Sequence, residues 1–205
     1  MTVTSDPTSD RILDAAMETM LNFGIRRTTM EGIAKRAGVS HMTVYRRWPS
    51  KNDLLLAVVM RESQKVFRAV DEDVAQLRTF DDKLIAGFTG IYWYVHTHPL
   101  LGRTLDTDPE SVLPTLTTGA GPALEMATDY LCAHITKACQ EQDITVVDPY
   151  GLAEIFVRLT HSLLITPRSR DQLTTKEKAE EYARRYILPI AQVATSRAAN
   201  RQPTH

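Results

Sequence analysis

Hydrophobic residues recur at intervals of three and four along nearly the whole chain, which is the spacing of one face of an α-helix. The alternation of apolar and polar residues that is typical of a half-buried strand is confined to Ile144–Val147. That run is short, and we expect it to form an extended loop. The sequence therefore predicts an all-α fold.

Glycines and capping residues divide the N-terminal region into short helices. The first helix is expected over about Ser9–Phe23, where Gly24 ends it because glycine tolerates the left-handed conformation of a helix C-cap. Thr28 and Glu31 have the spacing of a capping box and predict the start of a second helix. Gly38 follows soon after, so this second helix must be short.

A third helix and a long fourth helix follow the second. Ser40 is suited to cap a third helix over His41–Arg47, which Pro49 ends. Ser50 and Asp53 repeat the spacing of a box-like helix start and predict a long fourth helix. Further helices are expected at about Phe80–Thr97, Leu100–Leu105, Gly121–Gln142, Pro149–Thr166 and Lys176–Arg197.

The charges support a division into two domains. Residues 1–52 carry eight Lys and Arg residues against five Asp and Glu residues, whereas residues 53–205 carry sixteen against twenty. A basic segment joined to an acidic body indicates that the N-terminal part meets a polyanion. We expect a DNA-binding domain over residues 1–52, with residues 1–8 disordered, and a larger helical domain over residues 53–205.

The second predicted helix, the turn at Gly38 and the third helix have the order of a helix-turn-helix, whose second helix enters the major groove of DNA. Ile33 and Ala34 are expected to pack inward from the first of these two helices, and Val44 and Trp48 from the second. The remaining residues of the third helix would then face the DNA side.

The spacing within this segment resembles the DNA-binding signature of the TetR family of regulators. The matching residues cover about the first quarter of the chain and are Thr29, Ile33, Ala34, Ala37, Gly38, Val39, Ser40, Tyr45, Trp48, Lys51 and Leu54. The resemblance implies that the chain is a repressor that binds operator DNA, is released by a small molecule and acts as a homodimer on an inverted repeat. Trp48 stands where phenylalanine is common, and Arg46 stands where an aromatic residue or histidine is frequent.

The resemblance also implies roles for individual residues at the DNA. Tyr45, Lys51 and the region of Thr29 would contact phosphates, and Arg47 would contact either phosphate or base. The residues expected to face base edges are His41, Met42, Thr43 and Arg46, beside the capping residue Ser40. An arginine donates two parallel hydrogen bonds to guanine, so Arg46 is a candidate reader of that base.

The larger domain carries aromatic residues and apolar stripes. Consecutive aromatic residues at Tyr92–Tyr94 cannot all enter one core, so a ligand cavity, a subunit contact or plain solvent exposure covers part of them. By the resemblance, a largely apolar effector would contact Phe88, Trp93, Met126, Tyr130 and His161. The last two helices would pair with a second subunit through Phe156, Leu159, Leu163, Tyr186 and Ile190, although the same stripes could pack within one chain.

Other classes of function have less support. No catalytic or nucleotide-binding motif is present, so we expect neither an enzyme nor a cofactor. The alternative is a helical protein that binds a metal or another ligand without regulating DNA; its candidate metal ligands are His96, His98, Asp106, Asp108 and Glu110. We expect no functional metal there. No apolar run is long enough to span a membrane, and Cys132 and Cys139 are too far apart for a disulfide, which together favour a cytoplasmic location.

Overall fold

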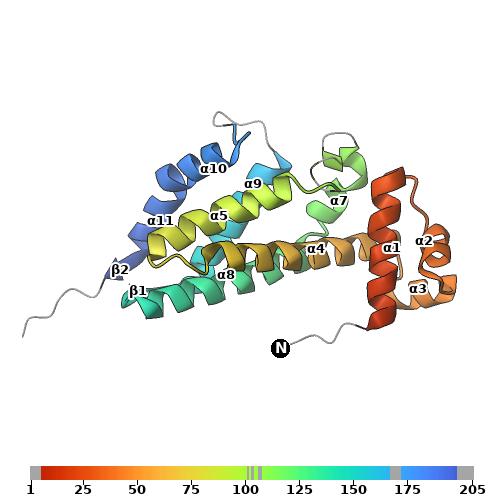
Figure 1. The fold of residues 1–205 in the computed structure, drawn as a ribbon, viewed down its shortest axis with the longest axis horizontal. Coiled ribbons are helices and arrows are strands. Elements are labelled where there is room, and N and C mark those ends of the chain that lie inside the picture. Colours follow the sequence, from red (N-terminus) through yellow and green to blue (C-terminus); the bar gives the residue numbers. More distant parts are fainter. Residues whose placement is uncertain (1–5, 101, 103, 106–107, 167–171, 198–205) are drawn as a thin grey trace, which may run out of the picture. The chain divides into compact units, whose positions relative to one another are not determined.

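A computed structural model of the chain describes residues 6–100, 102, 104–105, 108–166 and 172–197 (Figure 1). The described residues are mostly helical, which confirms the all-α prediction. The helices are α1 (Pro7–Phe23), α2 (Met30–Ala37), α3 (His41–Arg47), α4 (Lys51–Val74), α5 (Phe80–His96), η1 (Pro109–Ser111), α7 (Leu113–Leu116), α8 (Gly121–Glu141), α9 (Pro149–Ile165), α10 (Lys176–Tyr182), η2 (Ala183–Ile187) and α11 (Leu188–Ala194). None of these helices is both long and apolar enough to cross a membrane.

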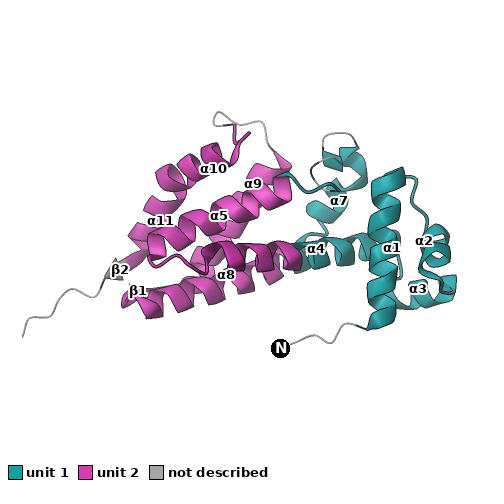
Figure 2. Ribbon diagram, viewed as in Figure 1, with its two compact units in different colours: residues 1–63, 97–123 teal, residues 64–96, 124–205 magenta. Residues whose placement is uncertain are grey.

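The chain divides into two compact units (Figure 2). Unit 1 comprises residues 1–63 and 97–123, and unit 2 comprises residues 64–96 and 124–205. These units do not coincide with the predicted segments 1–52 and 53–205, because the first part of α4 and the segment after α5 join the N-terminal helices in unit 1. Helix α4 therefore begins in unit 1 and ends in unit 2.

Helix α1 begins earlier than predicted. Asp6 accepts a hydrogen bond from the backbone N–H of Thr8 (3.1 Å) and so caps a helix whose first residue is Pro7. Proline is favoured at this position because its missing N–H would have no partner there. Pro7 and Thr8 are thus helical, contrary to the predicted disorder of residues 1–8; residues 1–5 of that segment lie outside the described part of the chain.

The start of α2 differs from the prediction by one residue. Thr29 is the N-cap and accepts a hydrogen bond from the Gly32 N–H (3.1 Å), whereas the Thr28 hydroxyl is turned back to the Gly24 carbonyl (2.8 Å). The predicted capping box between Thr28 and Glu31 is therefore wrong, because Thr28 lies outside the cap. The predicted end of α2 is confirmed, since Gly38 adopts the left-handed conformation with a φ of 65°.

The starts of α3 and α4 agree with the predictions. Ser40 accepts a hydrogen bond from the Thr43 N–H (3.2 Å) and caps α3. Ser50 and Asp53 cap each other at the start of α4: the Asp53 carboxylate accepts from the Ser50 N–H (3.0 Å), and the Ser50 hydroxyl accepts from the Asp53 N–H (3.2 Å). Each bond satisfies an N–H that no helical carbonyl can reach.

The segment between α5 and α8 holds short helical pieces. The predicted helix Leu100–Leu105 is supported at its described residues, because the N–H of Gly102 donates to the His98 carbonyl (2.9 Å) and that of Thr104 to the Leu100 carbonyl (3.0 Å). Leu101 and Arg103 lie outside the described residues. The helices η1 and α7 follow where the sequence showed no periodicity, since each is too short for a repeating pattern.

Unit 2 is built around an apolar core shared by α5, α8, α9, η2 and α11. Its buried residues are Phe80, Leu84, Ile85, Phe88, Ile135, Ala138, Cys139, Leu152, Ala153, Phe156, Ala183, Ile187 and Ala191. Cys132 and Cys139 are both free, as predicted.

Two predictions in unit 2 are wrong. Ile144–Val146 forms a strand, β1, rather than a loop, because it pairs in antiparallel register with β2 (Thr195–Arg197). The predicted helix Lys176–Arg197 accordingly ends at Ala194, and it is interrupted by a π-turn over Ala183–Ile187. Pro189 lies two residues after the end of this turn, and its lack of an N–H removes one α-helical hydrogen bond there.

Candidate functional site

Helix α3 exposes four of its seven side chains. Val44 is its buried residue, and α2 packs against both α1 and α3. Met42 is 64% exposed and Tyr45 is 37% exposed. His41 and Arg46 are exposed as well. The predicted outward face of the third helix is therefore present on the folded chain.

The polar groups at the start of α3 are engaged with one another. Besides capping the helix, the Ser40 hydroxyl lies 2.9 Å from the hydroxyl of Thr43. Thr43 is half-buried. These two residues, both predicted to lie at the DNA, thus fix the geometry of the helix start.

Arg47 is bound within the chain. Its guanidinium pairs with the carboxylate of Asp6, and its Nε donates to the hydroxyl of Ser9 (3.0 Å). The same arginine holds the pKa of Asp6 below its ordinary value. Arg47 therefore joins the end of α3 to the start of α1, a role that neither its position nor its charge indicated in the sequence.

The side chain of Lys51 is also hydrogen-bonded within the chain. Its Nζ donates to the carbonyls of Ile25 (2.7 Å), Thr28 (3.0 Å) and Arg26 (3.3 Å), which form the turn between α1 and α2. An ammonium has three N–H donors, and these bonds use all of them. Burial lowers the pKa of Lys51, and the negative charge of Asp108 acts in the opposite direction. In the structure without DNA, Lys51 is thus bonded to the chain's own carbonyls, and its phosphate contact stays a prediction.

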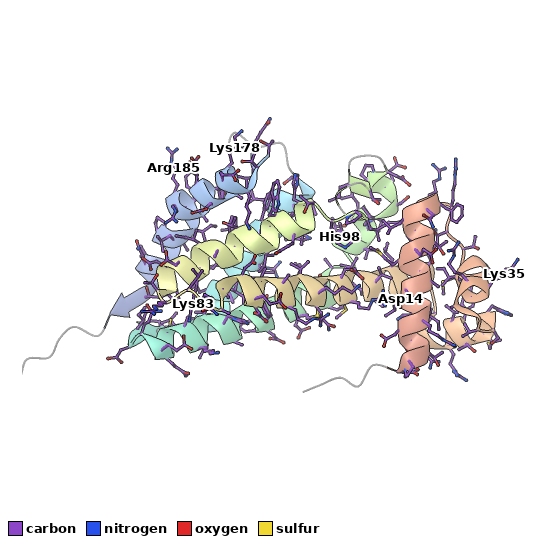
Figure 3. All side chains as sticks on the ribbon, in the orientation of Figure 1. Asp14, Lys35, Lys83, His98, Lys178 and Arg185 are labelled. Atoms are coloured by element: carbon purple, nitrogen blue, oxygen red, sulfur yellow. The ribbon has the colours of Figure 1, made fainter. Side chains whose placement is uncertain are left out.

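Five basic side chains of the N-terminal part remain exposed and form no ion pair with any described residue. They are Arg11, Arg26, Arg27, Lys35 and Arg46. Figure 3 shows Lys35 on α2, directed away from the helix. In contrast, Arg36 is paired with Glu18 of α1. The basic excess predicted from composition is thus divided between cations that stabilise the fold and cations that are available to an anion.

The residues predicted to line an effector site all lie in unit 2, but each of them contacts a different set of neighbouring side chains. Phe88 is a core residue that stacks on Tyr92 and Tyr182, with ring centroids 6.4 and 5.9 Å apart. Trp93 is half-buried, 5.8 Å from the ring of His96. Met126 contacts Gln64 of α4 (3.7 Å), and His161 is half-buried on α9.

Tyr130 belongs to a polar cluster that the sequence did not reveal. Its ring stacks on Phe67 at 4.1 Å, and its hydroxyl donates to the carboxylate of Asp71 (2.7 Å). Asp71 also lies 3.2 Å from the Nε2 of His134. Burial and the neighbouring carboxylate raise the pKa of Tyr130. The cluster joins α4 to α8, and no local sequence signal predicts a contact between residues so far apart.

The residues predicted for the dimer interface differ in their exposure. Phe156 is 2% exposed and packs in the core of its own unit, so its predicted place at a dimer interface is wrong. Leu159 and Leu163 are partly buried against the same core. Tyr186 and Ile190 are exposed, by 38% and 37% respectively. Ile155 of α9 and Val193 of α11 are large apolar residues that are exposed as well.

The described residues hold no group of three or more histidine, cysteine or carboxylate side chains arranged to bind a metal. Of the predicted candidates, Asp106 lies outside the described residues. His98 instead approaches the carboxylate of Glu62 (3.6 Å).

Comparison with known proteins connects the N-terminal helices to a family. Residues 12–58 match the family described as bacterial regulatory proteins of the tetR family, a range that includes α2, α3 and the start of α4. A transcriptional regulator of the helix-turn-helix type from Mycobacterium tuberculosis is 28% identical over 93% of this chain and 88% of its own length. The N-terminal helices of this chain therefore match the DNA-binding region of the TetR family.

Other relatives support this match over different lengths. A second M. tuberculosis regulator is 41% identical, but the matched region is 32% of this chain and about a third (35%) of that relative. The crystal structure of the TetR-family repressor AlkX from Dietzia has the same fold, with a TM-score of 0.72 and 23% identity over 91% of this chain and 98% of that one. These relatives are described as regulators, and the AlkX structure shows that the fold extends over most of this chain.

The position of Lys51 at the α1–α2 turn leads to a prediction about stability. Replacing Lys51 with alanine leaves the carbonyls of the α1–α2 turn without their donor, and we expect a loss of about 1–3 kcal/mol in the free energy of unfolding. Lys35→Ala is the matched control, because Lys35 is exposed and unpaired; it should change the stability by less than about 0.5 kcal/mol. Urea unfolding followed by circular dichroism measures both. Equal stabilities of the two variants would contradict the structural role of Lys51.

Proposed function

We propose that this protein is a transcriptional regulator of the TetR family that binds operator DNA with the exposed surface of α3. The observation that carries the proposal is that α3 presents His41, Met42, Tyr45 and Arg46 to solvent while its remaining polar side chains are bound within the chain. A helix-turn-helix reads DNA by placing such a surface in the major groove. Operator DNA lies in the cytoplasm, which agrees with the expected location of the protein.

The free cations around α3 complement this surface. Arg26, Arg27 and Lys35 carry charge that is not neutralised by described residues, and phosphate contacts supply most of the affinity of a protein for DNA. Tyr45 is exposed beside Arg46, so its hydroxyl is available to a phosphate oxygen. The N-terminus of α2 at Thr29 offers backbone N–H groups to a second phosphate.

The role of Arg46 is tested on DNA selected from genomic fragments by the purified protein. Arg46→Ala should weaken binding to the selected site by about 5- to 150-fold and relax its preference at one guanine in each half-site. Arg36→Ala is the matched control, since Arg36 is paired with Glu18 and should leave the preference intact. Fluorescence anisotropy over a panel of single-base variants measures both effects. A uniform loss across all bases would make Arg46 a phosphate contact instead.

We further propose that the protein binds as a homodimer. The apolar side chains left exposed on α9, η2 and α11 include Ile155, Tyr186 and Ile190, and they provide a surface that a second copy would cover. Leu159 and Leu163, which are partly buried, would border it. Two-fold symmetry would place two copies of α3 about 34–36 Å apart, or a multiple of that distance, on an inverted repeat.

The dimer is tested by placing a charge on this surface. Ile190→Glu should give a monomer in sedimentation velocity at micromolar concentration, because burying an unpaired carboxylate at an interface is unfavourable. The wild type should sediment as a dimer. Val147→Glu is the control, since Val147 is 92% exposed and lies just after β1, outside the proposed surface. A monomeric wild type, with and without DNA, would contradict the proposal.

We also propose that a largely apolar effector binds unit 2 and releases the DNA, as in a repressor. Trp93 is a half-buried aromatic residue of α5, and Tyr130 of α8 stacks on Phe67, so both offer apolar ring surface to such an effector. Relatives of the same fold support an acyl effector class: the regulator FadR of Bacillus subtilis, crystallised with stearoyl-CoA, has a TM-score of 0.53 and 19% identity over 84% of this chain and 96% of that one.

The effector proposal is tested with a panel of n-alkanes, fatty acids and fatty acyl-CoA esters. One class should release the wild type from its operator. Trp93→Ala should then need at least about tenfold more ligand for release while binding the operator with nearly unchanged affinity. Tyr94→Phe is the control on the same helix, because the Tyr94 hydroxyl contacts Asp73 (3.2 Å) rather than a ligand. A normal response of Trp93→Ala would show that the site lies elsewhere.

A further inference from the structure

Within α3, two exposed side chains make no bond to the rest of the chain and lie on one face. Thr43 is bonded to Ser40, and Arg47 is bonded to the start of α1. His41 and Tyr45 pack edge to face, with ring centroids 6.2 Å apart. Met42 and Arg46 remain. Because they are four residues apart, their side chains lie one above the other on the helix surface.

Met42 is unusual among these residues because it is large and apolar. It is 64% exposed, in a helix whose other exposed residues are polar or aromatic with a polar group. A single exposed apolar residue is common on protein surfaces. Here, however, it lies one turn from the arginine proposed to read guanine, on the helix that would enter the groove. The base that Arg46 contacts would therefore determine which neighbouring bases Met42 can reach.

The spacing of the two side chains matches the spacing of base pairs. Four residues of an α-helix rise about 6 Å along its axis. Successive bases of a DNA strand are about 3.4 Å apart along the duplex. A helix lying along the major groove would therefore bring the tip of Met42 to a base edge within about two base pairs of the base that Arg46 contacts.

The chemistry of the major groove identifies what a thioether side chain would contact there. Guanine, cytosine and adenine present hydrogen-bond donors and acceptors, whereas thymine alone adds a methyl group at C5. Methionine forms no strong hydrogen bond and gains free energy by covering apolar surface. We infer that Met42 is a specificity-determining residue that contacts the C5-methyl group of a thymine lying within two base pairs of the guanine read by Arg46. This inference rests on the proposed DNA binding.

The test removes the methyl group from the DNA instead of changing the base pair. Each thymine of the selected operator is replaced singly by deoxyuridine, which pairs normally but lacks the C5-methyl group, and binding is measured by fluorescence anisotropy. The wild type should bind about 3- to 10-fold more weakly when one particular thymine of each half-site is replaced. Met42→Ala should bind the unmodified operator more weakly by a similar factor and show no further loss with deoxyuridine at that position.

Two further variants make the result specific. Met42→Leu keeps an apolar side chain and should retain the sensitivity to deoxyuridine at the same thymine. Arg46→Ala should lose its preference at a guanine within two base pairs of that thymine. Because Met42 is exposed, all Met42 variants should unfold at the temperature of the wild type, which a thermal scan verifies.

The outcomes separate this inference from the proposed function. If the protein selects no DNA, the proposed function fails. If it selects DNA but no thymine is sensitive to deoxyuridine, or if Met42→Ala keeps the same sensitivity as the wild type, Met42 does not read a methyl group and the inference is overturned. A sensitive thymine more than two base pairs from the Arg46 guanine would also overturn it.

Discussion

The DNA-facing surface depends on holding a helix that is too short to be stable alone. Helix α3 has seven residues and buries Val44 alone among them, and isolated helices of this length are not stable in water. Its start is fixed by the Ser40 cap, its end by the bond from the Trp48 N–H to the Val44 carbonyl (2.9 Å), and its last turn by Arg47. Because α3 buries little of its own surface, the side chains of His41, Met42, Tyr45 and Arg46 are available to a partner.

The same constraint explains why the basic residues have different roles. Lys51 stabilises the turn before α2, Arg36 and Arg47 bind carboxylates of α1 or its cap, and Arg46 is left free. The amino-acid composition does not distinguish cations that are bonded within the chain from cations that are free. Sequence reasoning therefore predicted correctly that the N-terminal part carries positive charge, but it could not assign Lys51, whose partners are backbone carbonyls that no side-chain pattern indicates.

What the sequence predicted well are features set by neighbouring residues. Gly38, Ser40 and the pair Ser50 and Asp53 act within a few positions of themselves, so their spacing was sufficient to place the helices. Features that join distant parts of the chain were missed. Strand β1 exists because Ile144 pairs with Arg197, and the cluster around Tyr130 depends on Asp71 of another helix. Phe156 was misplaced because an apolar stripe fits a core and an interface equally well.

The central claim is that the surface of α3 left unused by the fold is the surface that meets DNA. A crystal structure of the protein bound to its selected operator tests this most directly. It should show Met42 and Arg46 against base edges in the major groove, with Lys51 Nζ still bonded to the carbonyls of Ile25 and Thr28. A complex in which α3 lies outside the groove, or in which Lys51 leaves those carbonyls for a phosphate, would contradict the claim.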